Sequence, residues 1–285
     1  MACISQKPDF IIIQNPPSIP TLLIAQWVGK LRKAWLIIDW HNFGYSILAM
    51  KLGEQHKVVQ LAKWYEQRLG HEAYAHMTVT DAMHQELKRW DVQGQIMTVR
   101  DKPQSDFKRL SLDQIHRQFT FSFKWIESLV QQTEDGNTFL GQFNQRALGT
   151  LLTDADQDGG LIWRHDRPRL IVSSTSWTED EDFSVLLRAV ELYERAALPS
   201  DPKLLFVITG NGPQKKFYLE KIKQLRLVKT HIVTAWLETG DYPLLLGSAD
   251  LGVSLHTSSS GMDLPMKVVD MFGCGLPVCA IDFPW

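Results

Sequence analysis

Short apolar runs alternate with polar turns and helical patterns along most of the chain. Apolar residues spaced three and four apart predict helices, and short apolar runs bounded by turn residues predict strands. In the first hundred residues the expected strands are Phe10 to Gln14, Trp35 to Trp40, Ala75 to Thr80 and Ile96 to Arg100, and the expected helices are Pro20 to Lys33, Tyr45 to Leu69 and Asp81 to Trp90. Strands that alternate with helices in this way form a parallel, Rossmann-like α/β layer.

The alternation stops near Asp101 and resumes near Arg167. Residues 131–160 are rich in Gln, Asp, Gly, Thr and Asn, which is typical of a surface insertion. Further strands are expected at Leu170 to Ser174, Leu204 to Thr209, His231 to Ala235, Leu251 to Leu255 and Pro277 to Ile281, with helices beginning near Thr178, Pro213, Asp241 and Pro265. We therefore expect an N-terminal domain over 1–105, a linker and insertion over 106–167, and a C-terminal domain over 168–285.

The expected fold class is α/β, with two Rossmann-like domains facing a cleft. Ligands of open α/β sheets bind beyond the carboxyl ends of the strands. The segments that follow strand ends, and so are predicted to line the cleft, are 39–44, 173–178, 210–213 and 257–270.

Composition and charge exclude some partners. The 285 residues include 30 Lys plus Arg and 32 Asp plus Glu, a formal net charge of -2 that gives no reason to expect a nucleic acid ligand. Cys3, Cys274 and Cys279 are odd in number and have no CxxC spacing, which favours a reducing, cytosol-facing location. No uninterrupted apolar stretch is long enough to span a bilayer, so no transmembrane anchor is predicted within this sequence.

The first candidate ligand-binding element is Gly210-Asn211-Gly212-Pro213, which follows a predicted strand and opens a helix at proline. Glycines let the backbone approach a ligand closely, and the free amides at a helix start favour a pyrophosphate. An ordinary βα turn that uses glycine for a positive φ explains the same four residues.

The second candidate is the segment 256–270, which joins a strand end to a helix. Lys267 and Asp270 are three residues apart, so both side chains project from one face near the helix start. Lys267 can then bind phosphate oxygens while Asp270 accepts hydrogen bonds from ribose hydroxyls. The alternative is an exposed salt bridge between the two side chains.

Together these two elements resemble the donor domain of GT-B glycosyltransferases. The shared pattern is GxGP after one strand, followed by Ser259-Ser260-Gly261, Leu264-Pro265, Lys267, Asp270 and Cys274-Gly275-Leu276-Pro277-Val278. More narrowly, the chain is similar to the mannosyltransferases of dolichol-linked N-glycan assembly. The segments that carry this resemblance are 14–17, 38–46, 62–66, 172–183 and 241–252, and the similarity is weakest between residues 107 and 160.

The resemblance implies a GDP-mannose-dependent β-1,4-mannosyltransferase that acts with inversion on a dolichol-linked chitobiose acceptor. The donor-binding residues it implies are Ser174, Thr175, Gly210, Gly212, Ser260, Gly261, Lys267 and Asp270. It also implies no tightly bound cofactor, a place at the cytosolic face of the endoplasmic reticulum membrane, and contact with that membrane surface and with other mannosyltransferases of the same pathway.

His41 is the candidate catalytic base, because it lies just beyond a predicted strand and Asp39 is near enough to orient it. The alternative is that His41 and Asn42 hydrogen-bond their loop or contact the acceptor pyrophosphate.

Two further features have structural alternatives. The acidic run Glu179 to Asp182 suggests a metal site, but Thr178 and Glu181 fit a capping box at a helix start, so no metal is expected. Residues 20–35 mix Leu, Ile and Trp with Lys and Arg, which suits contact with a membrane. A crossover helix whose apolar face covers the sheet is the preferred interpretation.

The chain departs from the resemblance at both ends. Compared with such enzymes, we expect the membrane anchor and first βα unit to be missing before the Phe10 strand, and the closing helices to be missing after the strand expected at Pro277 to Ile281. We therefore expect a fold that is incomplete at both termini, in which the first domain exposes apolar surface or an unpaired strand edge where the missing βα unit would pack. The alternative functions are a catalytically silent paralogue or isoform that binds nucleotide or a partner glycosyltransferase, and a GT-B enzyme with a soluble acceptor.

Overall fold

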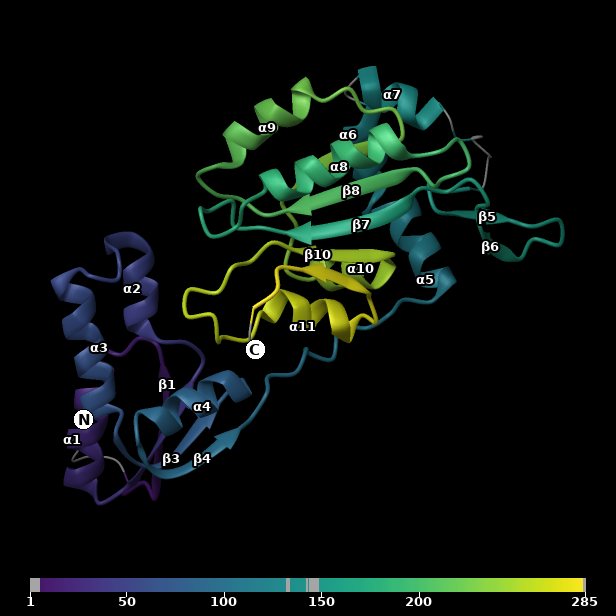
Figure 1. Cartoon of the computed structure of the whole chain (residues 1–285). Helices are drawn as coiled ribbons and strands as arrows, with labels where there is room; N and C mark the ends of the chain where they lie inside the picture. Colours follow the sequence, from purple (N-terminus) through teal and green to yellow (C-terminus); the bar gives the residue numbers. More distant parts are fainter. Residues whose placement is uncertain (1–5, 132–133, 142, 144–148, 284–285) are drawn as a thin grey trace. The chain divides into compact units, whose positions relative to one another are not determined.

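The computed structural model of the chain describes residues 6–131, 134–141, 143 and 149–283 (Figure 1). Cys3 lies outside the described residues. The chain divides into two compact units. Unit 1 comprises Met1–Asp101, Thr257–Pro265 and Asp282–Trp285, and unit 2 comprises Lys102–His256 and Met266–Ile281.

Unit 1 is a four-stranded parallel sheet with helices between its strands. Its elements are β1 (Phe10–Asn15), α1 (Thr21–Arg32), β2 (Trp35–Trp40), α2 (Gly44–Leu52), α3 (Lys57–Leu69), β3 (Glu72–Thr78), α4 (Asp81–Arg89) and β4 (Gln93–Thr98). The strands lie in the order β1-β2-β3-β4. Because parallel crossovers are right-handed, a sheet that grows in one direction carries all its crossover helices on one face.

The two faces of this sheet differ accordingly. Every second side chain of β2 is buried against side chains of α1 and α4: Leu36, Ile38 and Trp40. The side chains on the opposite face remain exposed although many are large and apolar: Phe10, Ile12, Trp35, Tyr74 and Met97. Apolar side chains of unit 1 are thus exposed on the face that carries no crossover helix among the described residues.

Unit 2 contains a five-stranded parallel sheet in the order β11-β10-β7-β8-β9. Its elements are β7 (Arg169–Ser174), α8 (Ser184–Ala196), β8 (Leu204–Thr209), α9 (Lys215–Gln224), β9 (Thr230–Ala235), α10 (Asp241–Ser248), β10 (Leu251–Ser254), α11 (Met266–Gly273) and β11 (Val278–Ala280). Here both faces are covered. Leu170 and Val172 belong to one apolar cluster, and the intervening Ile171 belongs to the other.

The segment 106–167, which the sequence predicts as a linker and surface insertion, is largely ordered into unit 2. It contains α5 (Leu112–Arg117), a π-helical turn η1 (Gln118–Ser122), α6 (Lys124–Gln131), α7 (Glu134–Gly141) and the hairpin of β5 (Thr153–Ala155) and β6 (Leu161–Trp163). One apolar face of the first helices enters the core with the following side chains: Ile115, Phe119, Phe123, Ile126 and Val130. This segment therefore completes one face of the unit 2 sheet.

Two predicted helices differ from the structure. The helix expected over Tyr45 to Leu69 is two helices, α2 and α3, because the chain turns at Gly53 with φ +82°. The helix expected from Thr178 begins only at Ser184. Thr178 and Glu181 therefore do not form a capping box, and the run Glu179 to Asp182 precedes the helix.

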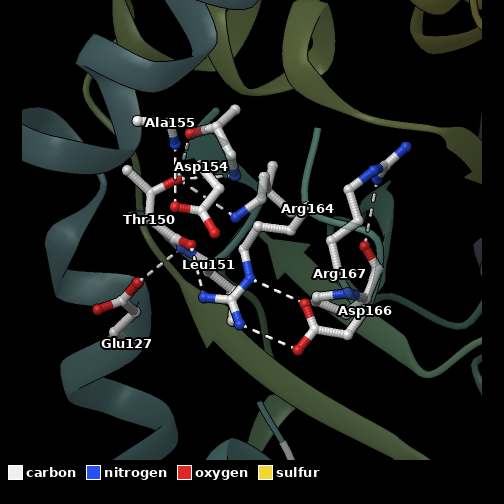
Figure 2. Close-up of polar contacts among 11 residues, drawn as sticks. Glu127, Thr150, Leu151, Asp154, Ala155, Arg164, Asp166 and Arg167 are labelled. Atoms are coloured by element: carbon white, nitrogen blue, oxygen red, sulfur yellow. Dashed lines mark hydrogen bonds and ion pairs between the residues drawn. The ribbon is translucent and has the colours of Figure 1, made fainter. Parts of the chain in front are cut away.

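A buried arginine joins the residues that precede and follow the hairpin (Figure 2). Arg164 is 8% exposed and forms two hydrogen bonds with Asp166, of 3.0 and 3.1 Å. Its Nη1 also donates to the carbonyl oxygen of Thr150 at 3.2 Å. Glu127 on α6 accepts from the backbone N–H of Leu151 at 3.1 Å, so the strands and the helix are joined through neighbouring polar contacts.

Replacing this arginine is expected to destabilise unit 2. Arg164→Met removes the charge partner of Asp166 and leaves the Thr150 carbonyl without its donor, which is expected to lower the free energy of unfolding by about 2 to 3 kcal/mol. Arg169→Met is the matched control, because the Arg169 side chain is 51% exposed and lies 4.0 Å from Asp250, and we expect a change below about 0.5 kcal/mol. Chemical denaturation measures both. Equal stability of the two variants contradicts the role given to Arg164.

Candidate functional site

Two loops at the carboxyl ends of β7 and β8 pack against each other in unit 2. Gly210 has φ +123°, and a Cβ built on it would lie 1.8 Å from the carbonyl oxygen of Thr175. A Cβ on Gly212 would lie 1.8 Å from the carbonyl oxygen of Ser176. The two glycines are therefore required for loop-to-loop packing, and no direct approach to a ligand is needed to explain them.

The carboxylate of Glu181 holds these loops in place through its hydrogen bonds. It is 3% exposed and accepts hydrogen bonds from the Thr175 hydroxyl and from the Ser176 backbone N–H, the latter at 2.7 Å. Its other oxygen accepts from Nζ of Lys267. The sequence assigned Glu181 to a helix cap, whereas the structure directs it back to the end of β7. A buried carboxylate is stable only with such partners.

Lys267 and Asp270 lie on the first turns of α11 but do not pair with each other. Lys267 pairs with Glu181, so the exposed salt bridge considered for Lys267 and Asp270 is not formed. Asp270 is partly buried, and this burial raises its pKa to about 6. Burial, with a contribution from the charge of Asp270, raises the pKa of Tyr242 on α10 to about 12. Near neutral pH Asp270 can therefore exchange a proton with little cost.

The structure places the predicted donor residues unequally. Four of them lie around Glu181: Thr175, Gly210, Gly212 and Lys267. Ser174 is the last residue of β7, and Asp270 lies three residues beyond Lys267 in α11. Ser260 and Gly261 instead belong to the segment of unit 1 at Thr257–Pro265. The sequence motif gave no sign that Ser260 and Gly261 belong to a different unit from Lys267 and Asp270.

In unit 1, His41 lies between two carboxylates. Its Nε2 is 3.0 Å from Oδ2 of Asp39, as expected, and its Nδ1 is 3.4 Å from Oδ2 of Asp101. Asp101 was not among the predicted site residues, although it directly follows the strand expected at 96–100. His41 can accept a proton only through a ring nitrogen whose lone pair is free, so a hydroxyl that approaches Nδ1 must displace Asp101.

A second buried glutamate holds the His41 loop. Glu66 on α3 is 1% exposed and accepts from the backbone N–H groups of Gly44 and Tyr45, at 2.7 and 3.4 Å. It also accepts from the Ser18 hydroxyl and from Nδ2 of Asn15. Burial raises the pKa of Glu66, while these hydrogen bonds oppose the rise. Glu66 thus fixes the start of α2 next to β1.

Ser260 lines a polar cavity of unit 1. The cavity has a volume of about 330 Å³ and is lined in part by Tyr45, Ser46, Lys63 and Ser259. The hydroxyl of Ser259 lies 3.2 Å from Nδ2 of Asn42 and 3.0 Å from the Ser46 hydroxyl. The 257–265 segment therefore contributes hydroxyl groups next to the His41–Asn42 loop.

One group among the described residues has metal-ligand chemistry: Asp180, Glu181 and His256, whose ligand atoms lie within 4.8 Å of one another. The most buried of the three, Glu181, already receives the Lys267 ammonium and two other donors. The ammonium supplies the positive charge that this carboxylate requires, so we assign the cluster no metal.

Comparison with known proteins shows what the chain resembles. Residues 163–284 match the family model described as glycosyl transferases group 1. The chain is 48% identical to chitobiosyldiphosphodolichol beta-mannosyltransferase of Pongo abelii over 96% of this chain and 58% of that protein. It is 42% identical to the UDP-glycosyltransferase TURAN of Arabidopsis thaliana, over 97% of this chain and 62% of that protein. The chain thus spans a little over half the length of these relatives.

Solved structures show the fold. An alpha,alpha-trehalose-phosphate synthase (UDP-forming) from Burkholderia vietnamiensis superposes with a TM-score of 0.56 at 10% identity, over 96% of this chain and 58% of that one. At this identity the likeness concerns the fold alone. It confirms the predicted α/β fold of GT-B type.

The loop packing at the two glycines generates a stability prediction. Gly212→Ala forces the Ser176 carbonyl to move, because the added methyl group would lie 1.8 Å from it, and we expect the free energy of unfolding to fall by about 2 to 3 kcal/mol. Gly240→Ala is the control, since a Cβ there meets nothing within 4 Å. Denaturant titration of both variants is the measurement. A Gly212→Ala protein as stable as Gly240→Ala would show that the two loops are not packed as described.

Proposed function

We propose, from the match of residues 163–284 to the family model of the group 1 glycosyl transferases, that the chain transfers mannose from GDP-mannose to a dolichol-linked chitobiose. The transfer would invert the anomeric centre and form a β-1,4 linkage. The observation that carries the proposal is the ion pair between the buried Glu181 and the partly exposed Lys267 at the end of β7, inside the region that matches the family model. The 48% identity to chitobiosyldiphosphodolichol beta-mannosyltransferase supports the choice of substrates.

On the donor side, the reaction requires positive groups for the departing nucleoside diphosphate. Lys267 is a cation of this site, and its position is set by Glu181. When the bond between the mannosyl carbon and the phosphate oxygen breaks, negative charge grows on the pyrophosphate, and a fixed ammonium stabilises that charge. Asp270 accepts from the ribose hydroxyls, and Ser174 and Thr175 line the loop beside it.

On the acceptor side, His41 is the proposed base. It takes the proton from the hydroxyl of the terminal N-acetylglucosamine as that oxygen attacks the mannosyl carbon from the face opposite GDP, which gives inversion. Asp39 holds the ring through Nε2. Nδ1 then receives the proton once the acceptor replaces Asp101 there, and the imidazolium that forms is stabilised by the Asp39 carboxylate at Nε2.

The proposed setting follows from the acceptor. A dolichol-linked substrate places the reaction at the endoplasmic reticulum membrane, and we propose its cytosolic face and a neighbourhood of other mannosyltransferases of the same pathway. The free thiols of Cys274 and Cys279 suit a reducing compartment. No helix among the described residues is long and apolar enough to cross a bilayer. Because the Arabidopsis relative is named a UDP-glycosyltransferase, UDP-sugars are the donors to compare with GDP-mannose in the assay.

The transfer assay tests the proposal. Incubation of the purified chain with GDP-mannose and a short-chain lipid-linked chitobiose is expected to add one mannose, detected by mass spectrometry. His41→Gln is expected to lower kcat by about a hundredfold or more with little change in the KM for GDP-mannose, because it removes the base and leaves the donor loops intact. His84→Gln is the control, since the one side-chain hydrogen bond described for His84 on α4 is with the Thr98 hydroxyl.

Three outcomes contradict parts of this account. Full activity of His41→Gln removes His41 from the base role. GDP binding without any transfer by the unmodified chain supports the catalytically silent alternative. Transfer from a UDP-sugar, or to a soluble sugar alone, replaces the proposed donor or acceptor.

A further inference from the structure

Helix α1 carries two apolar stripes where a crossover helix needs one. Leu22, Ala25 and Gly29 are buried and face the sheet. The second stripe has the same helical spacing on the opposite side and is exposed: Ile24, Trp27 and Leu31, at 53%, 69% and 71%. Solvent-facing positions of a helix are normally polar, so this second stripe is unexplained by the fold of unit 1.

Helix α3 repeats the pattern. Val59, Ala62 and Glu66 are buried, whereas Val58, Leu61 and Trp64 are exposed at 48%, 60% and 60%. The two helices are neighbours on the same face of the sheet, because the Tyr65 hydroxyl lies 3.4 Å from the Leu23 backbone nitrogen, and Nε2 of Gln26 donates to the Leu69 carbonyl at 3.0 Å (Figure 1). Both outer stripes therefore point away from the same sheet face and form one surface.

Positive charges outnumber negative ones on the two helices that form this surface. The helices and the residue that ends α1 carry the following cations: Lys30, Arg32, Lys33, Lys57, Lys63 and Arg68. Their only acid is Glu66, which is buried in unit 1. Lys30 pairs with Glu72 at 3.5 Å, an exposed pair of little strength, and the net charge of the surface stays positive.

We propose that this double stripe of α1 and α3 lies on an anionic lipid surface, with Trp27, Leu31, Leu61 and Trp64 inserted at the headgroup level. Tryptophan and leucine flanked by lysine and arginine on a helix in the plane of the interface are the chemistry that such a surface recognises. The exposed sheet face of unit 1 is also apolar but has Gln14, Asp39 and Gln95 between its apolar side chains, which does not suit lipid.

The inference complements the proposed function, which brings the chain to a lipid-linked acceptor, but its test does not depend on transfer activity. Phosphatidylcholine vesicles with and without phosphatidylserine are mixed with the chain and floated through a density gradient. The chain is expected to float with the anionic vesicles and to bind neutral vesicles about tenfold more weakly, with the difference shrinking at high salt.

Two variants and one control make the test specific. The double variant Trp27→Glu, Trp64→Glu is expected to lose at least about tenfold in anionic vesicle binding, while its thermal unfolding is unchanged because both side chains are exposed. Lys33→Glu, Lys57→Glu is expected to remove the preference for phosphatidylserine. Trp236→Glu in unit 2 is the matched control, since this tryptophan is 74% exposed but lies outside the stripes, and it is expected to bind as the unmodified chain does.

Failure of the unmodified chain to float overturns the proposal, as does equal flotation of the double tryptophan variant and the control. Light scattering of the chain without lipid tests whether the stripes instead join protein chains to one another. If the double variant dissociates an oligomer and vesicle binding is unaffected, the stripes are an interface between protein chains and the lipid assignment is wrong.

Discussion

The burial of the Glu181 carboxylate is the constraint on which the candidate donor site depends. A carboxylate at 3% exposure requires compensating donors, and it obtains them from Thr175, Ser176 and Lys267. These partners come from the end of β7 and the start of α11, which are far apart in sequence. Meeting the needs of one side chain therefore fixes the positions of a hydroxyl, a backbone amide and an ammonium.

The same pair sets the electrostatics of the site. A lysine held at one place by a buried acid loses little further freedom when an anionic ligand arrives, so more of its attraction is available for binding. Thr175 and Ser176 are also held from the other side, because Gly210 and Gly212 allow the next loop to pack on their carbonyl oxygens. In unit 1 Glu66 acts in a comparable way on the His41 loop through Gly44 and Ser18. Buried acids thus order both sets of candidate residues.

The positions of the strands and their parallel direction could be predicted, because the apolar runs are short and bounded by turns. β2 and β8 were predicted at the residue bounds that the structure has. The contribution of residues 115–130 to the core was not predicted, because the segment was interpreted from the polar residues that follow residue 131. Its apolar residues do recur at helical spacing: Ile115, Phe119, Phe123, Ile126 and Val130. The break at Gly53 was lost for a similar reason, since apolar residues continue on both sides of it.

Side-chain partners were less predictable than elements. Asp39 and His41 could be paired from sequence because they are two residues apart, but Asp101 reaches His41 from a different strand end. Glu181 fits a capping box by its spacing from Thr178, and only the tertiary structure shows that its carboxylate faces Lys267. The second stripes of α1 and α3 were visible as apolar residues, whereas their exposure depends on all the helices lying on one sheet face.

Calorimetric titration of GDP into the unmodified chain, Glu181→Gln and Glu181→Ala tests the central claim most directly. The account predicts saturable binding by the unmodified chain, with affinity lowered in Glu181→Ala by about tenfold or more because Lys267 and the Thr175 loop lose their anchor. Glu181→Gln keeps an acceptor for Thr175 and Ser176 and is expected to lie between the two. Equal GDP affinity of all three folded proteins, or no binding by the unmodified chain, would contradict the assignment of this site to a nucleotide donor.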